Sequence, residues 1–144
     1  MKPLINSLML CAALALCACQ PVPSVADQTL GVHNAQIRAL LPGRDTTAAY
    51  FTLSNHTDHA VTLTGAHANQ ARAIEMHETV LRGDSVSMRR VEQHCLASGE
   101  VVRFEPGGKH LMVFGVAEIN EPFEITLQFD NGEQLTASFS KLRN

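Results

Sequence analysis

The chain has 144 residues, of which 11 are Lys or Arg and 14 are Asp or Glu, so the formal net charge is −3 at pH 7. Hydrophobic residues make up 45% and charged residues 17%, which is typical of one globular domain and excludes a disordered or low-complexity chain. The weakly acidic charge gives no electrostatic basis for binding nucleic acid.

The amino-terminal residues have the pattern of an export signal. Lys2 precedes an apolar run over residues 4–18, which is too short to span a bilayer comfortably. Residues 16–19, LCAC, resemble a bacterial lipobox, although Cys17 is atypical at its position. We therefore predict a lipoprotein signal peptide over residues 1–18, with Cys19 as the lipidated first residue of the mature chain.

Lipidation of Cys19 would anchor the protein to a membrane facing the periplasm. Gln20 follows the cysteine, and a residue other than Asp there favours the outer membrane over the inner one. The alternative is an ordinary signal peptide cut nearby, which would leave a soluble periplasmic protein. Residues 19–28 contain two prolines and no periodic pattern, so we expect an extended tether before a domain at residues 29–144.

No part of that domain has an uninterrupted helical period. Short segments of alternating polar and apolar residues recur instead, separated by turn sequences such as Pro42-Gly43, Gly83-Asp84 and Asn131-Gly132. The predicted strands are residues 32–40, 48–55, 60–67, 73–81, 85–91, 100–104, 110–114, 122–129 and 135–139. Short strands at this spacing predict a single all-β domain, either a sandwich or a barrel.

Cysteine placement excludes a disulfide framework. Three of the four cysteines lie in the export segment, so the domain keeps only Cys95, with no C-x-x-C pair and no thiolate zinc site. We expect Cys95 to be a buried small hydrophobic residue. The alternative is an accessory metal ligand, since His94 lies beside it.

The main candidate site consists of His77, Met88, His110 and Met112. Thioether sulfur and imidazole suit a soft ion such as Cu(I), whereas zinc is rarely bound by thioethers. A thioether also cannot be locked into a disulfide in an oxidising compartment. Taken singly, a Met in a strand is usually a core residue and a His in a strand is usually a hydrogen-bonded or exposed side chain, so none of the four alone indicates a metal site.

The first pair is predicted to share a face of a hairpin. A two-residue Gly83-Asp84 turn pairs residue 82 with 85, residue 79 with 88 and residue 77 with 90. Because side chains alternate along a strand, His77 and Met88 then become diagonal neighbours. A three-residue turn would place them on opposite faces.

The second pair, His110 and Met112, is two residues apart in one strand and also shares a face. Residues 106–108, PGG, permit a sharp turn immediately before it. A common site then requires the sandwich to bring the two pairs face to face across the fold. Met76 falls on the face opposite to His77 and is predicted to be a core residue.

The spacing of the four residues, H-x10-M-x21-H-x-M, resembles the pattern of the periplasmic copper chaperone family PCuAC. The likeness covers about residues 30–140 and includes the segments Ala49-Tyr50, His77-Glu78-Thr79, Met88-Arg89 and residues 106–112, PGGKHLM. The resemblance implies a cupredoxin-like β-sandwich or barrel of Greek-key type. It also implies one Cu(I) ion per chain, bound by His77, Met88, His110 and Met112.

The same resemblance implies a monomeric, non-enzymatic metallochaperone that delivers copper for assembly of the Cu(A) site of cytochrome c oxidase. The implied partners are the copper subunit of the oxidase, Sco-type proteins and thiol-disulfide assembly proteins. The only expected membrane contact is through the lipid, and no nucleic acid is expected.

Three other functions are considered. The first is copper buffering or tolerance at the cell envelope, which uses the same site. The second is a blue-copper redox protein, which needs a His and a Met a few residues beyond a Cys, whereas the next His after Cys95 is His110. The third is a metal-free envelope sandwich. His56 and His59 flank a turn and are expected to be exposed polar residues, with weak metal binding as the alternative.

Overall fold

The structure is a computed structural model that describes residues 29–142. The predicted signal peptide, the lipidation site Cys19 and the tether at residues 19–28 lie outside the described residues. Within residues 29–142 there is no helix long and apolar enough to cross a membrane.

The described residues form an all-β fold, as predicted. The strands are β1 (Leu30–Ile37), β2 (Thr46–Asn55), β3 (Val61–His67), β4 (Ala73–Arg82), β5 (Ser85–Arg90), β6 (His94–Leu96), β7 (Val101–Phe104), β8 (Lys109–Phe114), β9 (Phe123–Phe129) and β10 (Gln134–Lys141). Nine of these overlap the nine predicted strands. The sequence did not predict β6, because three residues are too short to show an alternating pattern.

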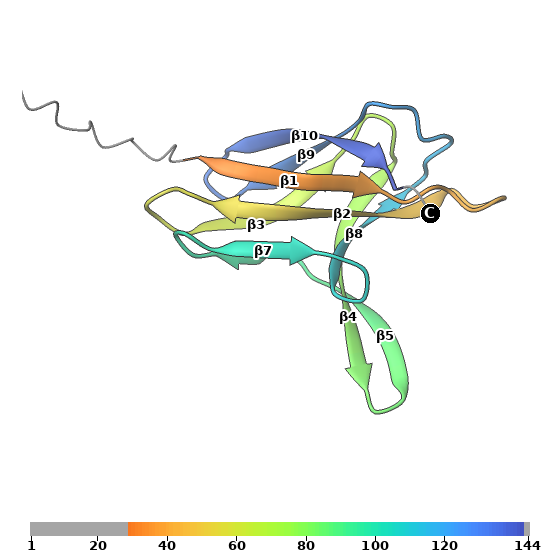
Figure 1. Cartoon of the computed structure of the whole chain (residues 1–144), viewed down its shortest axis with the longest axis horizontal. Coiled ribbons are helices and arrows are strands. Elements are labelled where there is room, and N and C mark those ends of the chain that lie inside the picture. The colour runs from red at the N-terminus through yellow and green to blue at the C-terminus, as the bar shows by residue number, and fades with distance from the viewer. Residues whose placement is uncertain (1–28, 143–144) are drawn as a thin grey trace, which may run out of the picture.

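The strands follow the order β5-β4-β8-β7-β2-β1-β10-β9-β3-β6. The parallel pairing of β1 with β10 joins the group of strands from β5 to β1 to the group from β10 to β6. Strand β2 pairs with β1 along one edge. Along its other edge, the first half of β2 pairs with β8 and the second half pairs with β7. Figure 1 shows β1, β2, β7, β9 and β10 in the body of the molecule, with the β4–β5 hairpin projecting away from it. Within the sheet, the pairing of the first part of β4 with β8 attaches that hairpin to the body.

The core is built from alternate residues of the central strands. In β9, Phe123, Ile125 and Leu127 are fully buried while the residues between them face outward. Phe51 and Phe104 stack with ring centroids 4.3 Å apart. Each such side chain contributes about 1.5–3 kcal/mol of burial free energy. All six residues of β5 are exposed, so this strand of the projecting hairpin adds almost nothing to the core.

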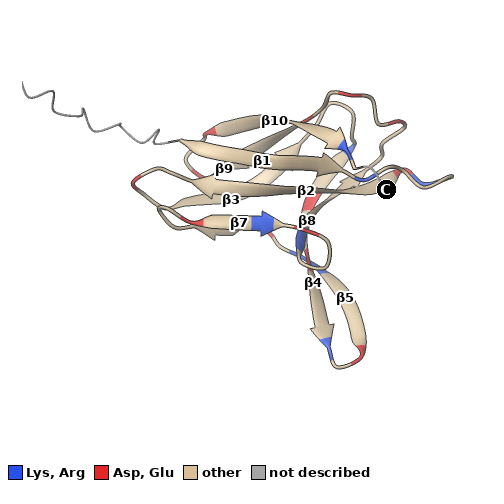
Figure 2. Ribbon diagram, in the orientation of Figure 1, with Lys and Arg blue, Asp and Glu red and all other residues tan. Residues whose placement is uncertain are grey.

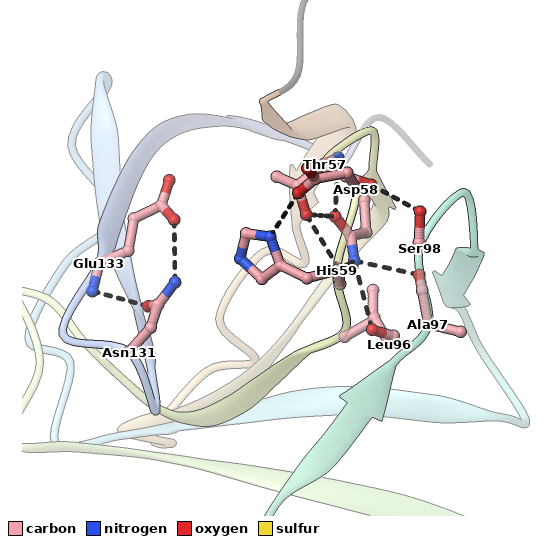
Figure 3. Close-up of polar contacts among 9 residues, drawn as sticks. Thr57, Asp58, His59, Leu96, Ala97, Ser98, Asn131 and Glu133 are labelled. Atoms are coloured by element: carbon pink, nitrogen blue, oxygen red, sulfur yellow. Dashed lines mark hydrogen bonds and ion pairs between the residues drawn. The ribbon is translucent and has the colours of Figure 1, made fainter.

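A buried asparagine closes the end of the fold remote from the hairpin. The Nδ2 group of Asn55 donates to the carbonyl oxygens of His59, Leu96 and Ala97, at 2.8, 3.3 and 3.0 Å. Its Oδ1 accepts hydrogen bonds from the amide and the hydroxyl of Thr57. Figure 3 shows these groups converging from the loop after β2 and from the end of β6. One side-chain amide thus supplies hydrogen-bond partners to backbone groups in two segments, the loop after β2 and the end of β6.

We expect Asn55→Ala to lower the free energy of unfolding by about 3 kcal/mol, because it leaves buried carbonyl and N–H groups without partners. Urea denaturation of the exported chain measures this loss. Asn131→Ala is the matched control, since Asn131 is exposed and its side chain bonds only to Glu133. That control should change stability by less than about 1 kcal/mol. Equal losses in the two variants would contradict the role given to Asn55.

Candidate metal centre

The β4–β5 hairpin has the predicted register. Residue 77 pairs with 90, residue 79 with 88 and residue 82 with 85, about a two-residue turn in which Gly83 has φ of 57°. A positive φ is what a tight hairpin turn requires, and glycine adopts it without strain. His77 and Met88 therefore lie on one face of the hairpin, as diagonal neighbours.

The second pair lies beside the first on the same sheet. Strand β4 also pairs with β8, which sets His77 directly opposite His110 and Glu75 directly opposite Met112. His77, Met88, His110 and Met112 consequently share one face of three adjacent strands, β5, β4 and β8. The expectation that the two pairs would meet across the sandwich was wrong, because β4 has β5 on one edge and β8 on the other.

Met76 is 5% exposed and lies on the opposite face of β4, so its assignment to the core is confirmed.

The two imidazoles are close enough to share an ion. Their ring centroids are 6.1 Å apart, with the rings inclined at 42°. Two imidazoles that bind one ion through nitrogen at about 2 Å have centroids at most about 6.5 Å apart. The separation of His77 and His110 therefore lies within the range that two imidazoles bound to one ion can have.

A pocket of about 360 Å³ opens on this face. Met88, His110 and Met112 line it together with Thr79, Tyr50 and the Pro106-Gly107 turn, whereas His77 is not among its lining residues. His110 is 4% exposed and Met88 is 61% exposed. The site thus has a buried imidazole on one side and a solvent-exposed thioether on the projecting hairpin.

The proton positions of the two imidazoles follow from their hydrogen bonds. His110 Nδ1 lies 3.1 Å from the carbonyl oxygen of Gly108, which can only accept, so Nδ1 carries the proton and Nε2 carries the lone pair. His77 Nε2 lies 3.0 Å from Oε2 of Glu75. Its other nitrogen, Nδ1, is buried and has no hydrogen-bond partner. A buried nitrogen without a partner is costly unless something binds it, so this donor set fits a soft metal ion.

Charges around the site are paired. The hydrogen bond from His77, aided by the guanidinium of Arg90, holds the pKa of Glu75 below its usual value. On the opposite face, hydrogen bonds from Arg89 and Lys109 likewise lower the pKa of Glu78. Figure 2 shows both signs of charge where β4 meets β8 and again at the tip of the hairpin. None of the four candidate ligands is a carboxylate or a thiolate.

The remaining candidates lie elsewhere. Cys95 is a free, exposed cysteine, so its predicted burial was wrong. Alternation in β6 turns Leu96 inward and Cys95 outward. His94 packs edge-on against Phe104, and its pKa is lowered by burial and by nearby Lys109, which is on the face of β8 opposite to His110.

His59 bonds to Asp58 at 2.8 Å on an exposed loop, as Figure 3 shows. Among residues 29–142, no three His, Cys, Asp or Glu side chains gather in a metal-binding arrangement. Glu75, which contacts His77, was not among the site residues predicted from the sequence. Alternation alone could have placed it on the face of His77, two residues away.

Comparison with known structures defines the class of fold. The copper-bound PCuAC domain from PmoF2 is 20% identical to this chain with a TM-score of 0.67, covering 80% of this chain and 93% of that domain. The solution structure of CuI-DR1885 from Deinococcus radiodurans is 25% identical with a TM-score of 0.59, covering 89% of this chain and 84% of that protein. The predicted cupredoxin-like fold and the resemblance to PCuAC are confirmed.

The particular family follows from the sequence. The family described as "Putative lipoprotein LpqE-like" matches residues 30–140, and the chain belongs to it. The "Putative lipoprotein Lxx21020" of Leifsonia xyli subsp. xyli is 26% identical over 124 residues, covering 83% of this chain and 74% of that protein. RP573 of Rickettsia prowazekii is 32% identical over 91 residues, covering 60% of this chain and half of that protein.

We expect dilute hydrogen peroxide to oxidise Met88 at least about tenfold faster than Met76, because only the first thioether is open to solvent. Peptide mass spectrometry of the native protein over time measures both sulfoxides. Unfolding in urea should equalise the two rates, which controls for intrinsic reactivity. Equal rates in the native protein would contradict the exposed position of the hairpin thioether.

Proposed function

We propose that this protein binds Cu(I) through His77, Met88, His110 and Met112 and carries it as a metallochaperone of the cell envelope. The observation that carries the proposal is the cross-strand pairing of His77 with His110. Strand alternation adds Met88 and Met112 on the same face. Two thioethers and two imidazoles form a neutral, soft donor set that selects Cu(I) over zinc, calcium or magnesium.

The comparisons support this proposal. The similar PCuAC domain from PmoF2 is described as copper-bound, and DR1885 is described in a CuI form. The position of the site also suits a carrier rather than a permanent cofactor site. Met88 is exposed on β5, a strand that contributes little to the core, so an incoming ligand can displace its sulfur while the more buried His110 still holds the ion.

For the destination of the ion, we infer the Cu(A) centre of cytochrome c oxidase, reached directly or through Sco-type and thiol-disulfide assembly proteins. The support is the match to the PCuAC spacing over the four site residues. We further infer that the mature chain is a monomer in the periplasm, anchored by a lipid on Cys19, in the outer membrane rather than the inner one. The lipoprotein names of its family and of the Leifsonia relative support the anchor.

We expect the exported chain to bind one Cu(I) under anaerobic conditions. Met88→Ala or Met112→Ala should weaken binding at least about tenfold, since each removes one soft ligand, and tenfold corresponds to about 1.4 kcal/mol. Competition with a chromophoric Cu(I) chelator measures the affinity. Met76→Leu is the control, because this thioether lies in the core on the opposite face and the change conserves volume. Unchanged affinity in both alanine variants would refute the proposed ligand set.

The alternative function is copper buffering or tolerance at the envelope, which an outer-membrane anchor would favour. Deletion of the gene separates the two. For delivery we expect lost oxidase activity under copper limitation, restored by added copper. Copper sensitivity with normal oxidase activity would support buffering instead. Complementation with Met88→Ala serves as the control, since it should fail to restore either phenotype.

A further inference from the structure

Glu75 connects the candidate metal centre to a charged network on the surface of the hairpin. Its Oε2 lies 3.0 Å from Nε2 of His77, and its Oε1 lies 3.2 Å from Nη1 of Arg90. The three residues share a face: Glu75 and His77 are two apart in β4, and Arg90 of β5 pairs directly with His77. Arg90 is in turn 3.3 Å from Glu92. Both oxygens of Glu75 are thus engaged.

This arrangement determines which nitrogen of His77 is available. A carboxylate can only accept hydrogen bonds, so Nε2 must carry the proton that it donates to Glu75. In the neutral imidazole the lone pair is then on Nδ1, and this is the nitrogen that is buried without a partner. Rotation of the ring about its Cβ–Cγ bond would move both nitrogens to the positions of ring carbons, and the hydrogen bond to Glu75 opposes that rotation.

His110 is held in the opposite tautomer. Its Nδ1 donates to the carbonyl of Gly108 at 3.1 Å, which leaves the lone pair on Nε2. A backbone carbonyl thus orients one imidazole and a side-chain carboxylate orients the other. The two rings face each other across strands β4 and β8 with different nitrogens unprotonated.

We propose that Glu75 is a positioning residue that holds His77 so that it binds the metal through Nδ1, while His110 binds through Nε2. This inference rests on the proposed Cu(I) function. Arg90 supports the arrangement, because it binds the second oxygen of Glu75 and balances its charge beside the site. Glu75 does not ligate the ion in this scheme. It sets the tautomer and the ring orientation, as outer-sphere partners of ligating histidines do.

The first test reads the imidazole nitrogens of the exported chain by long-range 15N–1H NMR without metal. We expect the Nε2–H tautomer for His77 and the Nδ1–H tautomer for His110. Addition of Cu(I), which is diamagnetic, should shift the Nδ1 resonance of His77 and the Nε2 resonance of His110. A His77 proton on Nδ1 in the free protein, or a metal-induced shift that is larger at Nε2 than at Nδ1 of His77, would overturn the proposal.

The second test uses variants. Glu75→Ala should turn His77 into a mixture of tautomers and lower Cu(I) affinity by about ten- to a hundredfold. Glu75→Gln keeps a hydrogen-bond acceptor, so it should largely preserve the tautomer and lose less affinity. Glu78→Ala is the matched control: this glutamate is on the same strand but on the opposite face, bonded to Arg89 and Lys109. It should leave the His77 resonances and the affinity unchanged.

The readouts separate this proposal from the proposed function. Failure of the wild-type chain to bind Cu(I) would refute the function, whereas the tautomers of the free protein would still be measurable. Unchanged tautomer and affinity in a folded Glu75→Ala protein would refute the positioning role while leaving the ligand set intact. Far-ultraviolet circular dichroism establishes folding, and Glu75→Gln supplies the comparison if the alanine variant is destabilised.

Discussion

The candidate site depends on one constraint, the double pairing of strand β4. One edge of β4 carries β5 and the other carries β8, so His77 has Arg90 on one side and His110 on the other. Because backbone hydrogen bonds fix both registers, a slip of one residue would move Met88 to the opposite face on the β5 side, or His110 and Met112 on the β8 side. The relative positions of the four candidate ligands are therefore fixed as precisely as the strand pairing, although these residues come from three strands and are far apart in the sequence.

Stability and function are divided between two parts of the structure. The central strands bury the aromatic and aliphatic side chains and hold the loop asparagine, whereas β5 is exposed along its whole length. A strand that contributes little to the core can carry an exposed thioether and move locally without unfolding the domain. The buried His110, by contrast, comes from a strand whose alternate residues, Leu111 and Val113, are fully buried. The candidate site thus combines a ligand on a buried strand, His110 of β8, with a ligand on an exposed strand, Met88 of β5.

Charged side chains lie next to the candidate ligands and are paired with one another. Thioether and metal-bound imidazole ligands carry no charge of their own, yet charged residues lie within two positions of the candidate ligands in β4 and β5. Glu75 and Glu78 are each bound to a guanidinium, one on either face of the sheet. Paired in this way, the carboxylates orient hydrogen-bond donors without competing as hard ligands for a soft ion.

Local sequence determined a large part of this protein. Alternation and turn residues sufficed for the all-β class, for nine of ten strands and for the hairpin register, because Gly83-Asp84 permits a two-residue turn that specifies every pair beyond it. The spacing of two imidazoles and two thioethers identified the candidate ligands, and alternation assigned Met76 to the core.

Only the tertiary structure decided how the two ligand pairs meet. Which strand joins the free edge of β4 depends on the packing of the whole sheet, and no local pattern states that it is β8 rather than a strand of the facing layer. The outward turn of Cys95 was likewise set by a three-residue strand whose inward position is taken by Leu96. The tautomers of His77 and His110 depend on the orientation of Glu75 and of the Gly108 carbonyl, which exists only in the folded chain.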